Sequence, residues 1–176
     1  ISTRAAKIQE YGDEKLPAGD LTGDEVIVVE GRADVVNLLK NRVNNVIGMN
    51  GTKLPLEIAK LGKTKKLTLF VDGDRGGILI ARNVANNANL EFIAVAPDGK
   101  EVEELMGKEI LMALRKRVSP NEFFRRNRNE ISSAEVAVEE EQTAEVGKPV
   151  FDGDIKKEVK KKYEEIKGSR NALILD

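Results

Sequence analysis

Short apolar, β-branched runs alternate with stretches of helical periodicity through most of this chain. The apolar runs predict four strands, at residues 26–29, 46–49, 67–71 and 92–95. The intervening and following stretches predict helices over 33–40, 56–61, 77–87 and about 102–117. Continuous apolar strands between amphipathic helices are typical of a parallel sheet that is covered on both faces. We therefore expect an α/β fold with a central parallel sheet of about four strands, joined by right-handed βαβ units and flanked by helices on both faces.

The pattern divides the chain into four parts. Residues 1–24 are expected to be an N-terminal extension, 25–130 the main domain and 131–150 an acidic flexible linker. The linker has no aromatic residue and contains three successive glutamates, a composition typical of segments that cannot form a core. In 151–176 we expect a helix and a strand, which could pair with the first two dozen residues or with a missing part of the protein. Because the chain begins at Ile1, we expect a core excised from something longer.

Composition narrows the chemistry that the chain can perform. The 176 residues include no His, Cys or Trp, which excludes disulfides, thiol nucleophiles, Ser-His-Asp triads and His- or Cys-ligated metals. Catalysis must use carboxylates, Lys, Arg or Ser/Thr, and a bound metal would be a hard cation. No apolar run approaches the roughly 20 residues of a membrane span, and no signal segment opens the chain, so we expect a cytoplasmic protein without membrane partners.

Carboxylates follow three of the four predicted strands. Glu30 ends the first, Asp72 and Asp74 end the third, and the segment after the fourth carries Glu101 and Glu103. The carboxyl ends of parallel strands share one edge of the sheet, where α/β proteins bind ligands. We therefore expect Glu30, Asp72 and Asp74 to converge in a compact cluster. Such a cluster needs protons or a divalent cation to neutralise it, and Mg²⁺ is the simplest neutraliser at neutral pH.

Each acid also has a purely structural explanation. Asp-Gly is a common turn, and an acid in the first turn of a helix favourably meets the helix dipole. The sequence DGD recurs at 152–154, where we interpret it as a turn and helix cap, whereas the first copy ends an apolar strand. Asp34 either caps its helix or supports a metal from outside the ligand shell. Glu101 and Glu103 either bind a second cation or compensate a helix dipole.

Basic residues are interleaved with these acids. They can balance charge or hold phosphates. The nearest in sequence are Arg32, Lys53, Arg75 and Lys100. The lysines of 60–66 and the basic stretch 115–128 are either solvated surface or a nucleic-acid path.

The segments around the acids resemble the TOPRIM fold, in which Glu-Gly ends one strand and Asp-x-Asp ends another. Here these are VVEGRAD and LFVDGDRGG. Over about residues 2–128, the longer segments resemble the archaeal DnaG-type primases. These segments are STRAAKIQEYGDEKLPAG, VEGRADVVNLL, NGTK, FVDGDRGG and APDGKEVEEL.

This resemblance implies a primase, a DNA-directed RNA polymerase that synthesises short RNA primers for DNA replication by Mg²⁺-dependent nucleotidyl transfer. Mn²⁺ is expected to substitute for Mg²⁺. The acids that match the metal-binding and catalytic acids of the family are Glu30, Asp72 and Asp74. Asp34 matches a recurrent acid of the family, and bacterial relatives have Asp where this chain has Glu101 and Glu103, so these three are further candidates for the metal site.

The resemblance also implies partners. They are a single-stranded DNA template, ribonucleoside triphosphates, RNA, the replicative helicase and exosome subunits. Residues that we expect to contact phosphates or nucleic acid are Arg32, Lys53 and Arg75.

Two other functions stay open. Archaeal relatives also resemble exosome-associated proteins that favour adenine-rich RNA, a binding role that needs no chemistry at the acids. A nuclease or topoisomerase of the same fold is the third possibility. A topoisomerase needs a tyrosine nucleophile, for which the sequence offers Tyr11 and Tyr163.

Overall fold

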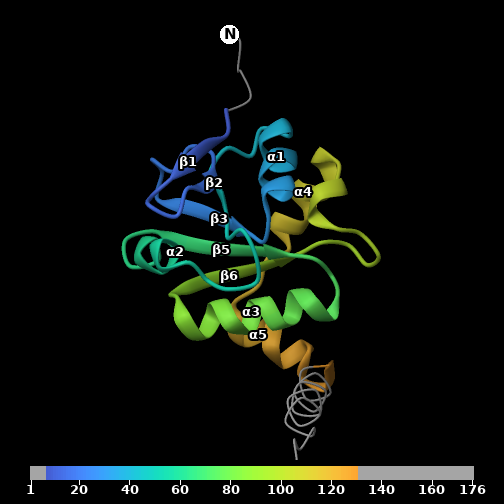
Figure 1. Ribbon diagram of the computed structural model, residues 1–176. Helices are drawn as coiled ribbons and strands as arrows, with labels where there is room; N and C mark the ends of the chain where they lie inside the picture. The colour runs from blue at the N-terminus through green and yellow to red at the C-terminus, as the bar shows by residue number, and fades with distance from the viewer. Residues whose placement is uncertain (1–6, 131–176) are drawn as a thin grey trace, which may run out of the picture. The chain divides into compact units, whose positions relative to one another are not determined.

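One sheet forms the centre of the part of the chain that the structure describes (Figure 1). The computed structural model describes residues 7–130, in which six strands lie in the order β1-β2-β4-β3-β5-β6. They are β1 (Gln9–Tyr11), β2 (Leu16–Ala18), β3 (Glu25–Val29), β4 (Val46–Gly48), β5 (Lys66–Val71) and β6 (Leu90–Val95). Strands β3 to β6 pair in parallel, which confirms the predicted α/β fold and its parallel sheet.

The N-terminal segment extends this sheet on the side of β4. β1 and β2 form an antiparallel pair, and β2 pairs antiparallel with β4 through Ala18 and Ile47. Leu16 and Ala18 are buried, so the expected N-terminal extension contributes to the core from within the sheet. The predicted linker at 131–150 and the predicted helix and strand at 151–176 lie outside the described residues.

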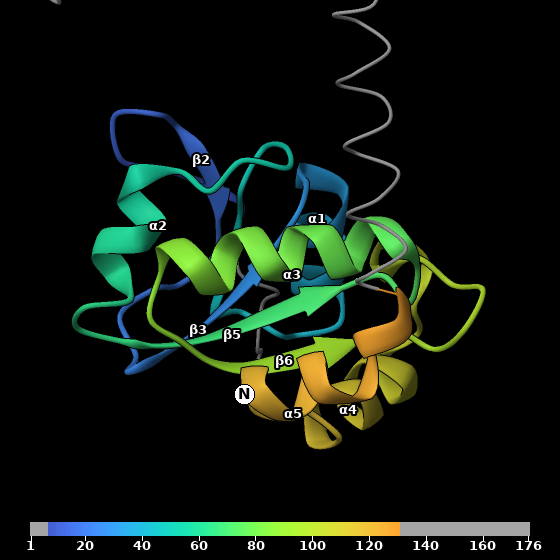
Figure 2. The same ribbon diagram turned by 90° about the horizontal axis from the view of Figure 1, so that it is seen from below.

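Helices cover both faces of the sheet (Figures 1 and 2). On one face lie α2 (Leu56–Leu61), α3 (Arg75–Asn87) and α5 (Pro120–Arg126). On the other lie α1 (Arg32–Lys40), the 3₁₀ turn η1 (Val102–Glu104) and α4 (Gly107–Arg115). Side chains of β3 alternate between the layers, with Val26 and Val28 facing α2 and α3, and Ile27 and Val29 facing α1 and α4. β3 is therefore buried on both faces, as its continuous apolar run predicted.

The single helix predicted over 102–117 is wrong, because the segment breaks after η1. Leu105 and Met106 have extended backbone, with ψ of 140° and 159°, and α4 begins only after them. The Nδ2 atom of Asn37 on α1 donates hydrogen bonds to the carbonyl oxygens of Val102 and Leu105, both at 2.9 Å. In a continuous α-helix the Val102 carbonyl would accept from the amide four residues further on. A side chain of α1 therefore takes an acceptor that a longer helix would need.

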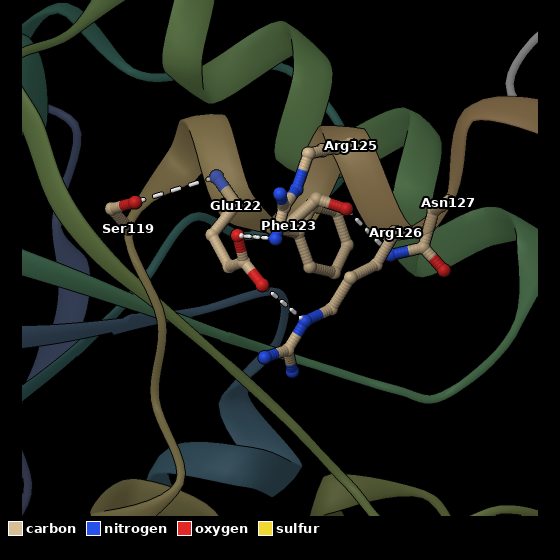
Figure 3. A network of polar contacts seen from close by, with 6 residues as sticks. All are labelled: Ser119, Glu122, Phe123, Arg125, Arg126 and Asn127. Atoms are coloured by element: carbon tan, nitrogen blue, oxygen red, sulfur yellow. Dashed lines mark hydrogen bonds and ion pairs between the residues drawn. The ribbon is translucent and has the colours of Figure 1, made fainter.

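Helix α5 has no counterpart among the predicted elements. It begins after Ser119, whose Oγ accepts the Glu122 N–H at 3.3 Å, and Pro120 is its first residue. Glu122 forms ion pairs with Arg125 and Arg126 (Figure 3). Two members of the basic stretch 115–128 thus have a partner within their own helix.

Candidate active site at the acidic edge of the sheet

The turn from β3 into α1 places two carboxylates at the carboxyl end of the strand. Glu30 follows the last residue of β3, and Gly31 is the N-cap of α1, with extended φ and ψ of −129° and 173°. Asp34 lies in the first turn of α1, and its Oδ2 accepts the Gly31 N–H at 2.9 Å. This bond confirms the capping role that was one of the two alternatives for Asp34.

The turn from β5 into α3 places the other two expected acids. Asp74 is the N-cap of α3, and its Oδ1 accepts the Gly77 N–H at 2.8 Å. The Oδ1 of Asp72 accepts the N–H of Val102 at 2.7 Å, which ties the end of β5 to η1. A Cβ on Gly77 would lie 2.3 Å from the Asp72 carbonyl oxygen. Glycine therefore allows α3 to begin this close to the strand end.

A cavity of about 410 Å³ opens at this edge, and we call it the acidic cavity. The carboxylates that line it are Glu30, Asp34, Asp72, Glu101 and Glu103. Asp74 lines a larger neighbouring cavity of about 650 Å³, and Asp72 lines both. The structure thus brings the predicted acids to one edge of the sheet and distributes them over two adjoining cavities.

Burial and mutual repulsion raise the pKa of two carboxyls in the acidic cavity. Burial is the largest cause at Glu30, and further increases come from the charges of Asp72, Asp74 and Glu101. Burial also raises the pKa of Asp34, to about 6, against the lowering effect of its hydrogen bond from Gly31. The charges that add to this increase belong to Asp72, Glu103 and Glu30. Oxygen donors of one charge, partly withdrawn from water, fit a hard divalent cation.

The compact cluster expected of Glu30, Asp72 and Asp74 stays a prediction. Within residues 7–130, no group of three or more carboxylates is arranged to hold a metal ion. One oxygen of each aspartate takes part in a hydrogen bond: the Val102 N–H donates to Asp72 and the Gly77 N–H donates to Asp74. The topology places these residues at one edge of the sheet, and the second oxygen of each aspartate is left as a ligand for a cation.

Two of the three predicted phosphate-binding residues border the acidic cavity. Arg32, the exposed first residue of α1, lines a neighbouring cavity that shares Glu103 with it. Lys53 is exposed in the loop between β4 and α2 and lines a different cavity, which shares Gly51 with the acidic cavity. Arg75 begins α3 directly after Asp74 and does not line the acidic cavity.

The larger cavity was not predicted from the sequence. Its apolar lining includes Ile93 of β6, Ala113 of α4 and Phe123 of α5. The sequence analysis missed this cavity because it did not predict α5. The segment Ser119-Pro-x-Glu122 nevertheless carries the pattern of a helix start: Ser119 is a cap residue, proline occupies the first helical position and glutamate the third.

Of the two tyrosines, the structure describes Tyr11, which does not lie at the acidic edge. Tyr11 lies in β1, which β2, β4 and β3 separate from β5. Tyr163 lies outside the described residues. The described fold therefore gives no support to a tyrosine nucleophile beside the acids.

The geometry of this edge agrees with comparisons to known proteins. Residues 24–97 match the family model of the Toprim domain. Curated relatives include two archaeal proteins named DNA primase DnaG. That of Nanoarchaeum equitans is 50% identical over 146 residues, which cover 81% of this chain and 38% of the relative. That of Archaeoglobus fulgidus is 46% identical over 175 residues, which cover 98% and 42%. The chain is thus homologous to the archaeal DnaG primases, as its sequence motifs predicted, and spans about two fifths of the length of these relatives.

Solved structures show the same fold. The RNA polymerase domain of Mycobacterium tuberculosis primase DnaG is 27% identical with a TM-score of 0.50, covering 58% of this chain and 39% of that one. A DnaG catalytic core is 22% identical with a TM-score of 0.53, covering 63% of this chain and 40% of that one.

Toprim primases are generally metal-dependent. Across residues 7–130, no helix has the length and apolar character needed to span a membrane.

Proposed function

We propose that this chain carries the catalytic centre of a primase, which synthesises RNA primers on a single-stranded DNA template. The observation that carries this proposal is the gathering of five carboxylates around one cavity at the carboxyl edge of a parallel sheet. The names of the archaeal relatives support primer synthesis over other chemistries of the Toprim domain. The adenine-rich RNA-binding role has no separate observation in its favour.

We propose Mg²⁺ as the cation of this edge, with Mn²⁺ as its substitute. Glu30, Asp72 and Asp74 would hold it. Asp34, Glu101 and Glu103 would add negative charge around it. Such a cation would offset the charge that develops on the attacking and leaving oxygens of a phosphoryl transfer.

In the proposed reaction, the 3′-hydroxyl of the growing RNA strand attacks the α-phosphate of a ribonucleoside triphosphate. A new phosphodiester bond forms, the bond between the α-phosphorus and the bridging oxygen breaks, pyrophosphate leaves with the electrons of that bond, and the hydroxyl proton passes to water. Arg32 and Lys53, which line cavities adjoining the acidic cavity, would hold phosphate groups, and Arg75 would do so from the start of α3.

The test is primer extension by a variant that combines Asp72→Asn with Asp74→Asn. Asparagine keeps an oxygen that can accept the Val102 and Gly77 N–H groups, so the fold should persist while the charge is lost. We expect Mg²⁺-dependent ribonucleotide incorporation on a single-stranded template to fall to background. Asp24→Asn, an exposed acid at the opposite end of β3, is the matched control and should retain the wild-type rate. Undiminished synthesis by the double variant would refute the proposal.

A further inference from the structure

Asn37 links α1 to the acidic edge through a short backbone segment, residues 101–105. Its Nδ2 donates to the carbonyl oxygens of Val102 and Leu105, both at 2.9 Å. The Val102 N–H then donates to the Oδ1 of Asp72 at 2.7 Å. Val102 is therefore held at its carbonyl by α1 and at its amide by a carboxylate of the proposed metal site.

The amide of Asn37 is itself oriented by a neighbour one helical turn away. The Nδ2 of Asn41 donates to the Asn37 backbone oxygen at 2.9 Å and to the Asn37 Oδ1 at 3.2 Å. Since Oδ1 is an acceptor in this pair, the Nδ2 of Asn37 faces the 101–105 segment. The buried side chains of Val102 and Leu105 anchor this segment in the same core cluster as α1.

The position of the 101–105 segment determines the positions of three carboxylates. Glu101 and Glu103 belong to it and line the acidic cavity. The hydrogen bond from Val102 fixes the rotation of the Asp72 carboxylate, so the place of its second oxygen depends on the place of the Val102 N–H. A displaced segment would therefore move two carboxylates directly and turn a third.

We infer that Asn37 is a positioning residue for the metal site, an inference that rests on the proposed function. It acts through the backbone of the 101–105 segment. The position of this segment sets the rotation of the Asp72 carboxylate and the positions of Glu101 and Glu103 at the acidic cavity. Removal of its amide leaves two carbonyl groups without this donor, and the segment is then held less firmly against α1. Groups that orient metal ligands in this way typically change metal affinity by about 10–100-fold when they are replaced.

The test measures Mn²⁺ binding to the full 176-residue chain, by electron paramagnetic resonance of free Mn²⁺. Asn37→Leu removes the donors and keeps a similar side-chain shape. Asn87→Leu is the control, since the Asn87 amide also donates to a helical carbonyl, that of Asn83 at 2.7 Å, but in the last turn of α3. We expect about 10-fold weaker Mn²⁺ binding for Asn37→Leu and unchanged binding for Asn87→Leu, both measured well below their melting temperatures.

Two further measurements separate positioning from a merely structural role. Hydrogen exchange at the Val102 amide should accelerate in the Asn37→Leu variant, because the 101–105 segment is released. Asn37→Gln, a milder change that retains amide donors, should weaken Mn²⁺ binding less than Asn37→Leu does. If the leucine variant fails to fold, the glutamine variant alone decides the question.

The outcome for Asp72→Asn in the same titration distinguishes two failures. If Asp72→Asn weakens Mn²⁺ binding but folded Asn37 variants bind as tightly as wild type, the positioning role is overturned and the proposed function stands. If Asp72→Asn also binds Mn²⁺ as wild type does, the acidic edge is not the metal site and both proposals fail. A lowered melting temperature with unchanged Mn²⁺ affinity would show that Asn37 only stabilises the fold.

Discussion

The two neighbouring glycines at the start of α3 should respond oppositely to replacement by alanine. A Cβ on Gly77 would lie 2.3 Å from the Asp72 carbonyl oxygen and 3.2 Å from the Cβ of Val71. These atoms belong to the end of β5 and cannot rotate away. A Cβ on Gly76 would have the Oδ1 of Asp74 as its nearest neighbour, at 3.3 Å, and that side chain can move.

The expected free energies follow from two effects. Alanine favours a helix over glycine by roughly 1 kcal/mol, a gain available at both positions. At Gly77 the contact with backbone should cost about 3 kcal/mol, the upper end for overpacking. The Gly77→Ala variant should therefore lose about 2 kcal/mol of unfolding free energy, while Gly76→Ala gains about 1 kcal/mol. At about 3 °C per kcal/mol, their melting temperatures should differ by roughly 9 °C.

Thermal unfolding followed by circular dichroism measures this difference. The Gly77→Ala variant should also bind Mn²⁺ more weakly, because the displaced strand end carries Asp72. If Gly77→Ala melts at or above the temperature of Gly76→Ala, the close approach of α3 to β5 does not require glycine.

Two further predictions concern pH and the core. The pKa of Asp34, about 6 in the folded state against an ordinary 3.8, means that folding favours its protonated form, so the contribution of Asp34 to stability should be greatest at low pH and fall as pH rises through this window. Asp34→Asn keeps an acceptor for the Gly31 N–H and should therefore stabilise the metal-free chain by about 1 kcal/mol at pH 7, after allowance for solvent screening, and not at pH 4. Urea unfolding at both pH values measures this, and a gain independent of pH would contradict it. Phe70→Ala, at a side chain 1% exposed in β5, should cost about 3–5 kcal/mol in urea unfolding. The half-buried Phe92 is its control, and an equal cost at Phe92 would show that burial does not set the difference.

The local pattern of the sequence was sufficient for strands β3 to β6, most helices and the location of the acids, but not for β1 and β2. Continuous apolar runs predicted β3 to β6 because strands buried on both faces must be apolar on both. Acids directly after two of those runs had to meet at one edge, because parallel strands point the same way. These inferences depend on neighbours in sequence and on a topology with few alternatives.

Only the tertiary structure decided how the edge is built in detail. At the break between η1 and α4 the Val102 carbonyl accepts from Asn37, 65 residues earlier in the sequence, and no periodicity within 102–117 records that contact. The same is true of the hydrogen bond that turns Asp72 toward η1 and of the shared cavity walls. Periodicity determines which face of an element is buried. The competition for individual hydrogen-bond acceptors and the rotation of each carboxylate are settled only when distant elements pack together.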